Sequence, residues 1–268
     1  MKSHFAQKYG DLEQWHWWFR GRKKILQSVL GRELHQSAQR SMLSIGCGPA
    51  AGLDWLIPFA GPRGHVVGLD INALHALHRP AGIGFVVGSA EKPPLADASF
   101  DVVLALDVLE HLDDDHAGLE EVLRLLRPGG MLLVTVPALP SLWGQQDIVS
   151  EHRRRYTRGT LKRLFDGAGL SHYWMSYFNS LFFPVVAGFR WTRRALRTGQ
   201  NATSDFERNR PGLLNSALAV TFGGERHWLS HASLPIGVSL IAVYKRPAVA
   251  TASGAAPDQR ARRRPQRS

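Results

Sequence analysis

MLSIGCGPAAGLDWLIPFAGPRGHVVGLDIN, residues 42–72, is the stretch that decides the fold of this chain. A short apolar run, residues 42–45, stops at a glycine turn. A helical segment follows, and a second apolar run, residues 66–69, is closed by Asp70. Strand, turn, helix, strand and acid follow one another in the order of a nucleotide-binding βαβ unit.

The glycine turn and the acid each have a physical role in binding a ligand. Gly46 and Gly48 lack Cβ atoms, so the backbone can turn sharply there and lie against the ligand. The carboxylate of Asp70, at the tip of the second strand, can accept hydrogen bonds from both hydroxyl groups of a ribose. The combination predicts a site for a cofactor that contains adenosine.

Later motifs indicate which cofactor this is. They are GSAE at residues 88–91, VVLALDVLEHL at residues 102–112 and LRPGGMLLVTVP at residues 126–137. Together with the glycine turn, they resemble the ordered motifs of class I S-adenosylmethionine (SAM) dependent methyltransferases, in the branch with small-molecule and quinone methyltransferases. The segment HWWFR, residues 16–20, and the segment HRRRY, residues 152–156, resemble one bacterial subgroup of this family.

The resemblance implies SAM as the cofactor, with S-adenosylhomocysteine as its product. It also implies the positions of the cofactor-binding residues, which are Ile45, Gly46, Cys47, Gly48, Asp70, Ile71, Ser89, Ala90, Glu91 and Leu106. The sequence departs from the family pattern at Ser44, where an acid usually precedes the glycines, at Ala50 and at Ser89. Ser44 puts in doubt the usual carboxylate at the methionine end of the cofactor.

Methyl transfer from SAM releases a neutral thioether, so alignment of the reactants and exclusion of water can supply most of the catalysis. A base is needed only where the acceptor holds a proton that it does not lose unaided. The candidate catalytic residues are Asp107, His111, His152 and Tyr156, and for His111 a supporting position beneath the cofactor is the favoured alternative. Glu110 is expected to cap or brace its turn.

The aspartates at residues 113–115, with His111 and His116 on either side, have two interpretations. The acids suit the N-terminus of a helix, where the positive end of the helix dipole favours them, and this interpretation is preferred. A metal site is the alternative, and we expect none.

The remaining elements complete an α/β fold. We expect a doubly wound, mainly parallel Rossmann-like sheet with an antiparallel edge strand, N-terminal helices and an insertion before the last strand. Predicted strands cover residues 42–46, 65–70, 84–88, 100–106, 130–136, 170–178 and 237–244. The predicted organisation is an N-terminal helical segment at 1–40, the methyltransferase-like domain at 41–246 with an insertion at about 179–232, and a disordered basic tail at 247–268.

Composition bears on the compartment and the partners. The 268 residues carry a formal net charge of +11, which suggests phosphate-bearing partners or a solvated basic surface. The single cysteine, Cys47, fits a reducing compartment, and the N-terminus has no apolar signal core, so a cytoplasmic location is expected. The uncharged stretch 173–189 and the arginines after it suit either an interfacial segment at the inner face of an anionic membrane or a wall of the substrate pocket.

Three functions compete at this point. The first is SAM-dependent methyl transfer to a small-molecule or lipid-linked acceptor. The second is an NAD(P)-dependent oxidoreductase, because GCGPAA also fits a relaxed dinucleotide turn. The third is a nucleic-acid-binding module, which the charge suggests. No recognised nucleic-acid-binding motif accompanies the arginines, so we expect no specific nucleic acid as a partner.

Overall fold

The chain is described here from a computed structural model, which covers residues 11–34, 38–77, 79–168, 170–195 and 209–248. The N-terminal residues 1–10 and most of the predicted basic tail lie outside the described residues. Among the described residues, no helix is long and apolar enough to cross a membrane.

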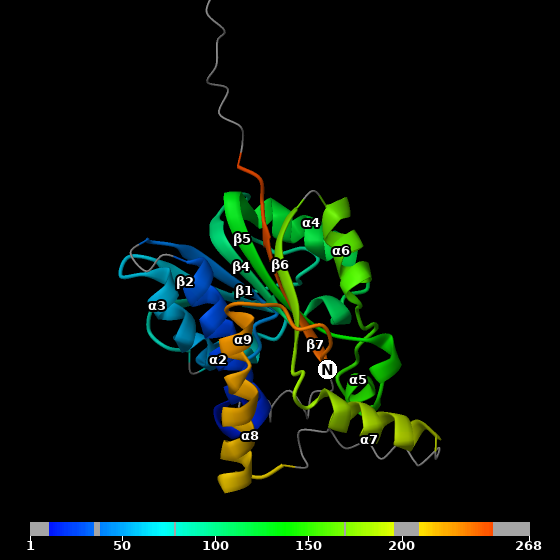
Figure 1. Cartoon of the computed structure of the whole chain (residues 1–268). Coiled ribbons are helices and arrows are strands. Elements are labelled where there is room, and N and C mark those ends of the chain that lie inside the picture. The colour runs from blue at the N-terminus through cyan, green and yellow to red at the C-terminus, as the bar shows by residue number, and fades with distance from the viewer. Residues whose placement is uncertain (1–10, 35–37, 78, 169, 196–208, 249–268) are drawn as a thin grey trace, which may run out of the picture.

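A seven-stranded sheet forms the centre of the molecule, in the order β3-β2-β1-β4-β5-β7-β6 (Figure 1). The strands are β1 (Ser41–Ile45), β2 (His65–Asp70), β3 (Ile83–Val87), β4 (Phe100–Leu106), β5 (Leu126–Pro137), β6 (Ser171–Phe178) and β7 (Ser239–Lys245). The first five pair in parallel, and β7 pairs antiparallel with both β5 and β6. The predicted α/β fold with an antiparallel edge is therefore confirmed.

Helices cover both faces of the sheet, as near-continuous apolar strands require. One face carries α2 (Trp17–Glu33), the 3-10 helix η1 (Ala50–Leu56), α3 (Ile57–Ala60), α8 (Leu213–Gly224) and α9 (Arg226–Leu229). The other face carries α4 (Asp115–Leu125) and α6 (Arg158–Gly167). The shorter elements are η2 (Ala73–Ala76), η3 (Leu109–His111), η4 (Pro140–Leu142) and α5 (Gln145–Val149), and α7 (Phe183–Ala195) extends away from the sheet (Figure 1).

The N-terminus of α4 has the predicted cap, but its C-terminus lies earlier than expected. The side chain of Asp114 accepts hydrogen bonds from the backbone of His116 and Ala117, at 2.9 and 3.1 Å. The helix ends at Leu125, and the segment 128–130, which was expected to end it, lies inside β5. Antiparallel pairing explains the longer strand, because the backbone N–H of residue 129 donates to the carbonyl of residue 246 at 3.0 Å.

The insertion between β6 and β7 packs against the N-terminal helices. A Cβ atom on Gly21 of α2 would lie 2.4 Å from a ring carbon of Phe222 of α8, so the two helices approach at a glycine. Asn215 of α8 accepts from the backbone N–H of Trp17 and donates to the carbonyl of Trp15, at 2.9 and 2.6 Å. These bonds satisfy backbone groups where the helical residues 11–15 meet α2.

A buried acid fixes the start of the insertion. Glu225, with a fully buried side chain, accepts hydrogen bonds from three successive backbone N–H groups. The donors are Asn179, Ser180 and Leu181, at 2.7, 2.7 and 2.8 Å. These bonds hold the turn after β6 against the end of α8. The insertion is therefore an integral part of the wall beside the carboxyl ends of the strands.

Candidate functional site

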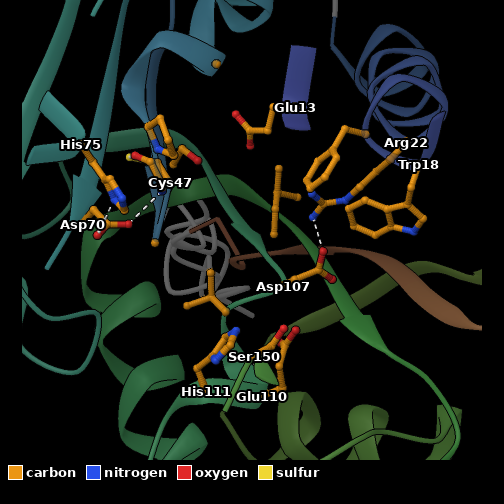
Figure 2. A pocket seen from close by; sticks show the side chains of 18 of the residues that line it. Glu13, Trp18, Arg22, Cys47, Asp70, His75, Asp107, Glu110, His111 and Ser150 are labelled. Carbon is orange, nitrogen blue, oxygen red and sulfur yellow. Dashed lines mark hydrogen bonds and ion pairs between the residues drawn. The ribbon is translucent and has the colours of Figure 1, made fainter. Parts of the chain in front are cut away.

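A cavity of about 1460 Å³ lies at the carboxyl ends of β1, β2 and β4. The strand order reverses between β1 and β4, which is where open α/β sheets bind ligands. Residues from the N-terminal helices, the glycine turn, η3, α5 and α7 line it. Figure 2 shows Asp70 and Cys47 on one side of the cavity, Arg22 and Asp107 on another, and Glu110 and His111 together at a third.

The glycine turn and Asp70 are joined directly. Gly46 and Gly48 have positive φ angles of 56° and 61°, which glycine adopts without steric cost. The backbone N–H of Gly48 donates to Asp70 Oδ2 at 2.8 Å, and that of Asn72 donates to Oδ1 at 2.9 Å. His75 Nδ1 lies 3.0 Å from the same Oδ1. Burial opposes ionisation of Asp70, but these contacts outweigh it and lower the pKa of the carboxyl, so Asp70 is a carboxylate.

The predicted cofactor residues gather at this part of the cavity, with one exception. The residues that line it are Gly46, Cys47, Gly48, Asp70, Ile71, Ser89, Ala90, Glu91 and Leu106. Ile45 is buried inside β1 and does not line the cavity. One oxygen of Glu91 accepts from the backbone N–H groups of Asp113 and Asp114, at 3.0 and 3.2 Å. Glu91, the acid of the GSAE motif, therefore also binds the backbone of the loop that precedes α4.

Cys47 has the environment of a packing residue. Burial raises the pKa of its thiol far above the usual value, and the charge of Asp70 adds to this effect. A thiol that stays protonated is a poor nucleophile, so Cys47 fills space in the glycine turn.

Glu13 is a cavity residue that the sequence analysis did not identify. It lines the cavity close to the glycine turn, because a Cβ atom on Gly52 would lie 2.5 Å from Glu13 Oε2. Burial raises the pKa of Glu13 to about 7, although the positive charges of Arg22, Lys23 and His75 oppose the shift. The one feature of the sequence that could have identified Glu13 is its position just before the HWWFR segment. An acid from the N-terminal helical residues thus lies near Cys47 of the glycine turn, and its charge acts on that thiol.

Asp107 lines the cavity, but its carboxylate is already engaged. Arg22 Nη2 lies 2.6 Å from Asp107 Oδ2, and the hydroxyl of Thr135 donates to Oδ1 at 3.1 Å. The guanidinium of Arg22 also stacks on the ring of Trp18, 4.8 Å from its centroid. Asp107 has a positive φ of 57°, an uncommon angle for a residue other than glycine. Asp107 is therefore an anchor for α2 rather than a free base.

His152 is oriented by a buried acid. Its Nδ1 lies 2.9 Å from Asp147 Oδ1, which also accepts from Arg155 Nε at 2.7 Å. Burial opposes the ionisation of Asp147, but the bonds from His152 and Arg155 lower its pKa to about 2. Arg190 of α7 lies 3.5 Å from the other oxygen of Asp147. The sequence pointed to His152 but not to Asp147, which lies in α5 shortly before it, or to Arg190, which approaches from α7.

Glu110 and His111 lie next to His152. The rings of His111 and His152 meet edge to face with 4.8 Å between their centroids. Burial, with help from the charge of His152, lowers the pKa of His111 to about 4, so the imidazole is neutral at pH 7. The side chain of Glu110 is fully buried, and among the described residues neither carboxylate oxygen has a hydrogen-bond partner. Glu110 was expected to cap or brace its turn, and a cap through its side-chain oxygens is not seen among the described residues.

Burial also raises the pKa of Glu110 well above the usual value, and the charge of Asp107 adds to the shift.

Tyr156 has a structural position. Its side chain is buried, it does not line the cavity, and its hydroxyl donates to Asp115 Oδ2 at 2.8 Å. Burial and this hydrogen bond raise the pKa of the phenol above its usual value. We therefore remove Tyr156 from the candidate catalytic residues, because it can neither reach a ligand in the cavity nor ionise readily.

Residues 43–134, which supply the glycine turn, Asp70, Asp107 and the Glu110–His111 pair, match the family model described as "Methyltransferase domain". The chain contains a methyltransferase domain. The cofactor of this domain is SAM, and the domain is that of an enzyme. The geometry agrees with that cofactor, since a buried carboxylate and a turn of two left-handed glycines meet in one cavity.

Two curated relatives support the assignment. A "Probable S-adenosylmethionine-dependent methyltransferase" of Mycolicibacterium smegmatis is 32% identical over 163 residues, or 59% of this chain and 61% of the relative. A phthiotriol/phenolphthiotriol dimycocerosates methyltransferase of Mycobacterium ulcerans is 37% identical over 101 residues, or 36% of this chain and 37% of the relative. The chain thus spans less than two thirds of the length of these relatives.

Solved structures show the same fold around the methyltransferase domain. A SAM-dependent methyltransferase from Thermotoga maritima superposes with a TM-score of 0.54 at 18% identity, covering 92% of this chain and all of that one. The [4+2]-cyclase SpnF superposes with a TM-score of 0.55 at 16% identity, covering 84% and 81%. Because a cyclase shares the fold, the reaction must be argued from the side chains of the cavity.

Proposed function

We propose that this chain transfers a methyl group from SAM to a small, lipid-like acceptor. One observation carries the proposal: a single cavity holds the carboxylate of Asp70 beside the glycine turn on one side, Asp107 on a second side and His111 on a third (Figure 2). Its volume of about 1460 Å³ exceeds the ~300–1,000 Å³ of an ordinary ligand site, which leaves room for a cofactor and an acceptor.

Two carboxylates would hold the cofactor in this cavity. Asp70 would accept hydrogen bonds from the ribose hydroxyls, which compete with His75 for its Oδ1. Glu13 would face the ammonium group of the methionine part, in place of the acid that Ser44 lacks. Bound SAM supplies an electrophilic methyl group with a neutral thioether as leaving group. The protein then has to align the acceptor and exclude water, and the wall of Trp17, Trp18 and other apolar side chains suits that role.

The lipid-like character of the acceptor rests on the surface beside the cavity. Val186 and Arg190 of α7 line the cavity, while the outer side of the same helix exposes large apolar side chains. These are Val185 and Phe189, with 71% and 44% of their surface exposed. A phthiotriol methyltransferase is named among the relatives, and this agrees with an apolar acceptor.

The same surface would rest on an anionic membrane, which places the proposed reaction at the cytoplasmic face of the cell membrane. Arg193 lies over the ring of Phe189, 5.5 Å from its centroid, so a cation accompanies the apolar face. Arg190, which the sequence analysis grouped with the membrane arginines, instead points inward, with an 11% exposed side chain near Asp147. Arg194 and Arg197 cannot be added to this surface, because the side chain of the first and the whole of the second lie outside the described residues.

Calorimetry with S-adenosylhomocysteine and with NAD tests the cofactor part of the proposal. We expect the first to bind and to raise the melting temperature, and the second to do neither. Incubation with methyl-labelled SAM and total bacterial lipid tests the acceptor part, with an aqueous metabolite extract as the comparison. Label that appears only in the aqueous extract would contradict a lipid-like acceptor, and binding of NAD alone would contradict methyl transfer itself.

A further inference from the structure

Glu110, His111 and His152 form a compact group of possible ligand atoms in the cavity. Each offers one nitrogen or oxygen, and these atoms all lie within 4.8 Å of one another. Glu110 and His111 belong to η3, directly after β4, whereas His152 follows α5. All three line the cavity, so the space between them opens toward a bound acceptor.

The condition of Glu110 points to a missing partner. Its side chain is fully buried, and within the described part of the chain both carboxylate oxygens lack a hydrogen-bond partner. An unsatisfied buried polar group costs about 1–3 kcal/mol, so native structures rarely leave one without a reason. A cation between Glu110 and the two imidazoles would satisfy both oxygens at once.

His152 is prepared as a ligand by its surroundings. Asp147 holds its Nδ1 at 2.9 Å, which fixes the ring and leaves Nε2 for another partner. Asp147 is itself held by Arg155 Nε at 2.7 Å and by the backbone N–H of Gly144 at 2.8 Å. Histidines that bind metals usually donate their other nitrogen to a carboxylate in this way. The ring of His152 is therefore held in one orientation, as the ring of a metal-binding histidine is.

We propose that Glu110, His111 and His152 bind a divalent first-row transition-metal ion at the acceptor side of the cavity. Two imidazoles and one carboxylate are a ligand set that Zn²⁺, Fe²⁺ and Co²⁺ accept, with the remaining positions open. The open positions face the cavity, where water or an oxygen of the acceptor would complete the coordination. The proposal replaces the sequence expectation that the chain has no metal site, and it does not depend on methyl transfer.

Metal binding by the full chain can be measured directly. The protein is stripped with a chelator and titrated with Co²⁺, with visible absorption and calorimetry as readouts. We expect one equivalent to bind, and Zn²⁺ to displace it because Zn²⁺ binds such sites more tightly than Co²⁺. His111→Gln and His152→Gln should each weaken binding by at least about tenfold, the lower end of the effect reported for supporting residues of metal sites.

Two further variants make the result decisive. Glu110→Gln keeps the size of the side chain but removes the charge of the proposed carboxylate ligand, so it should also weaken Co²⁺ binding. His116→Gln is the matched control, since His116 is exposed and lies outside the cavity. We expect its Co²⁺ binding to equal that of the unaltered chain. Thermal unfolding of each variant without metal confirms that it is folded.

The outcomes separate this proposal from the proposed function. One equivalent of Co²⁺ that is lost in the three cluster variants and kept in His116→Gln supports the site. Binding that survives all three variants, or the lack of saturable binding below about 1 mM, overturns it. A thiolate charge-transfer band would assign the ion to Cys47 and also overturn it. Binding of S-adenosylhomocysteine to the unaltered chain is measured in parallel. If the unaltered chain does not bind S-adenosylhomocysteine, that result counts against the methyltransferase proposal and not against the metal site.

Discussion

Arg22 Nη2 lies 2.6 Å from Asp107 Oδ2, an ion pair that ties the N-terminal helix α2 to the end of β4. The same guanidinium nitrogen donates to the hydroxyl of Thr135 on β5 at 2.8 Å. Both side chains are mostly buried, with 12% and 20% of their surface exposed. The wall of the cavity that carries Trp17 and Trp18 is therefore fixed to the sheet at the point where the acceptor would bind.

Arg22→Gln should destabilise the protein, because it leaves the buried carboxylate of Asp107 without its charged partner. We expect a loss of roughly 1.5–3 kcal/mol in the free energy of unfolding, the range for a hydrogen bond to a charged group. Lys23→Gln is the matched control on the same helix, because Lys23 and Asp54 form an exposed pair at 3.6 Å. Such a pair contributes about 0–1 kcal/mol. Urea unfolding of both variants checks the difference, and equal losses would contradict the anchoring role.

Asp70→Asn should weaken the binding of S-adenosylhomocysteine. The change removes the charge that would hold the ribose hydroxyls, and we expect a loss of roughly 1.5–3 kcal/mol in binding free energy, or about 10- to 150-fold in affinity. Asp97→Asn provides the control, because Asp97 is 76% exposed and lies outside the cavity. Calorimetry measures both. Unchanged affinity in Asp70→Asn would show that another group holds the ribose.

The sequence predicted the parallel part of the sheet well because β1 to β4 each contain an apolar run that is followed by a glycine or an acid. The start of β5 was missed, since Leu126 pairs with Phe100 of β4, and the backbone of residues 129 and 130 bonds to residue 246 just after β7 in spite of the helix-ending pattern of this segment. The contact of the glycine turn with Asp70 was predictable because both belong to one βαβ unit. Glu13 was missed because its relation to the glycine turn is a contact between distant segments.

The same limit affected the candidate catalytic residues. Tyr156 was chosen for its chemistry, but its contact with Asp115 is set by the packing of α4 against the segment after α5. Arg190 was assigned to a membrane surface because it follows an apolar stretch, whereas Asp147 draws it inward. Local pattern identifies the type of side chain, and the direction in which it points depends on tertiary contacts that a single sequence does not contain.

Glu13 should make the stability of the ligand-free protein depend on pH. The folded protein holds the proton of Glu13 up to a pKa of about 7, whereas the unfolded chain releases it near the usual glutamate pKa of 4.5. The contribution of Glu13 to stability is therefore fully present below the unfolded pKa and is lost as the pH rises to about 7. Compared with Glu13→Gln, the unaltered chain should lose up to about 3 kcal/mol across this window. Urea unfolding at several pH values measures it, and parallel profiles would refute it.

Tyr156→Phe should reduce stability without affecting the cavity. The change removes the hydrogen bond to Asp115, whose other oxygen keeps its pair with Arg154 at 2.8 Å. We expect a loss of roughly 1–2 kcal/mol in the free energy of unfolding. The affinity for S-adenosylhomocysteine and the turnover of any acceptor should stay within a factor of about two, because less than ~0.5 kcal/mol is expected away from the site. A large fall in turnover with the fold intact would restore Tyr156 as a catalytic candidate.

The exposed face of α7 should bind anionic vesicles. Val185 and Phe189 project apolar side chains from a helix whose inner side lines the cavity, and Arg193 lies beside them. The double variant Val185→Ser with Phe189→Ser removes apolar area, and at about 0.8 kcal/mol per buried CH₂ group it should weaken binding at least about tenfold. Arg193→Gln should weaken binding to anionic vesicles by about 1 kcal/mol and have no effect on binding to neutral vesicles.

Val87→Ser is the control, since Val87 is 51% exposed at the end of the edge strand β3. Co-sedimentation of the full chain with vesicles measures all four proteins, and because the tail is identical in each, a difference reports α7 alone. Equal sedimentation of all four would leave this face as a cover for the acceptor and remove the membrane from the proposal.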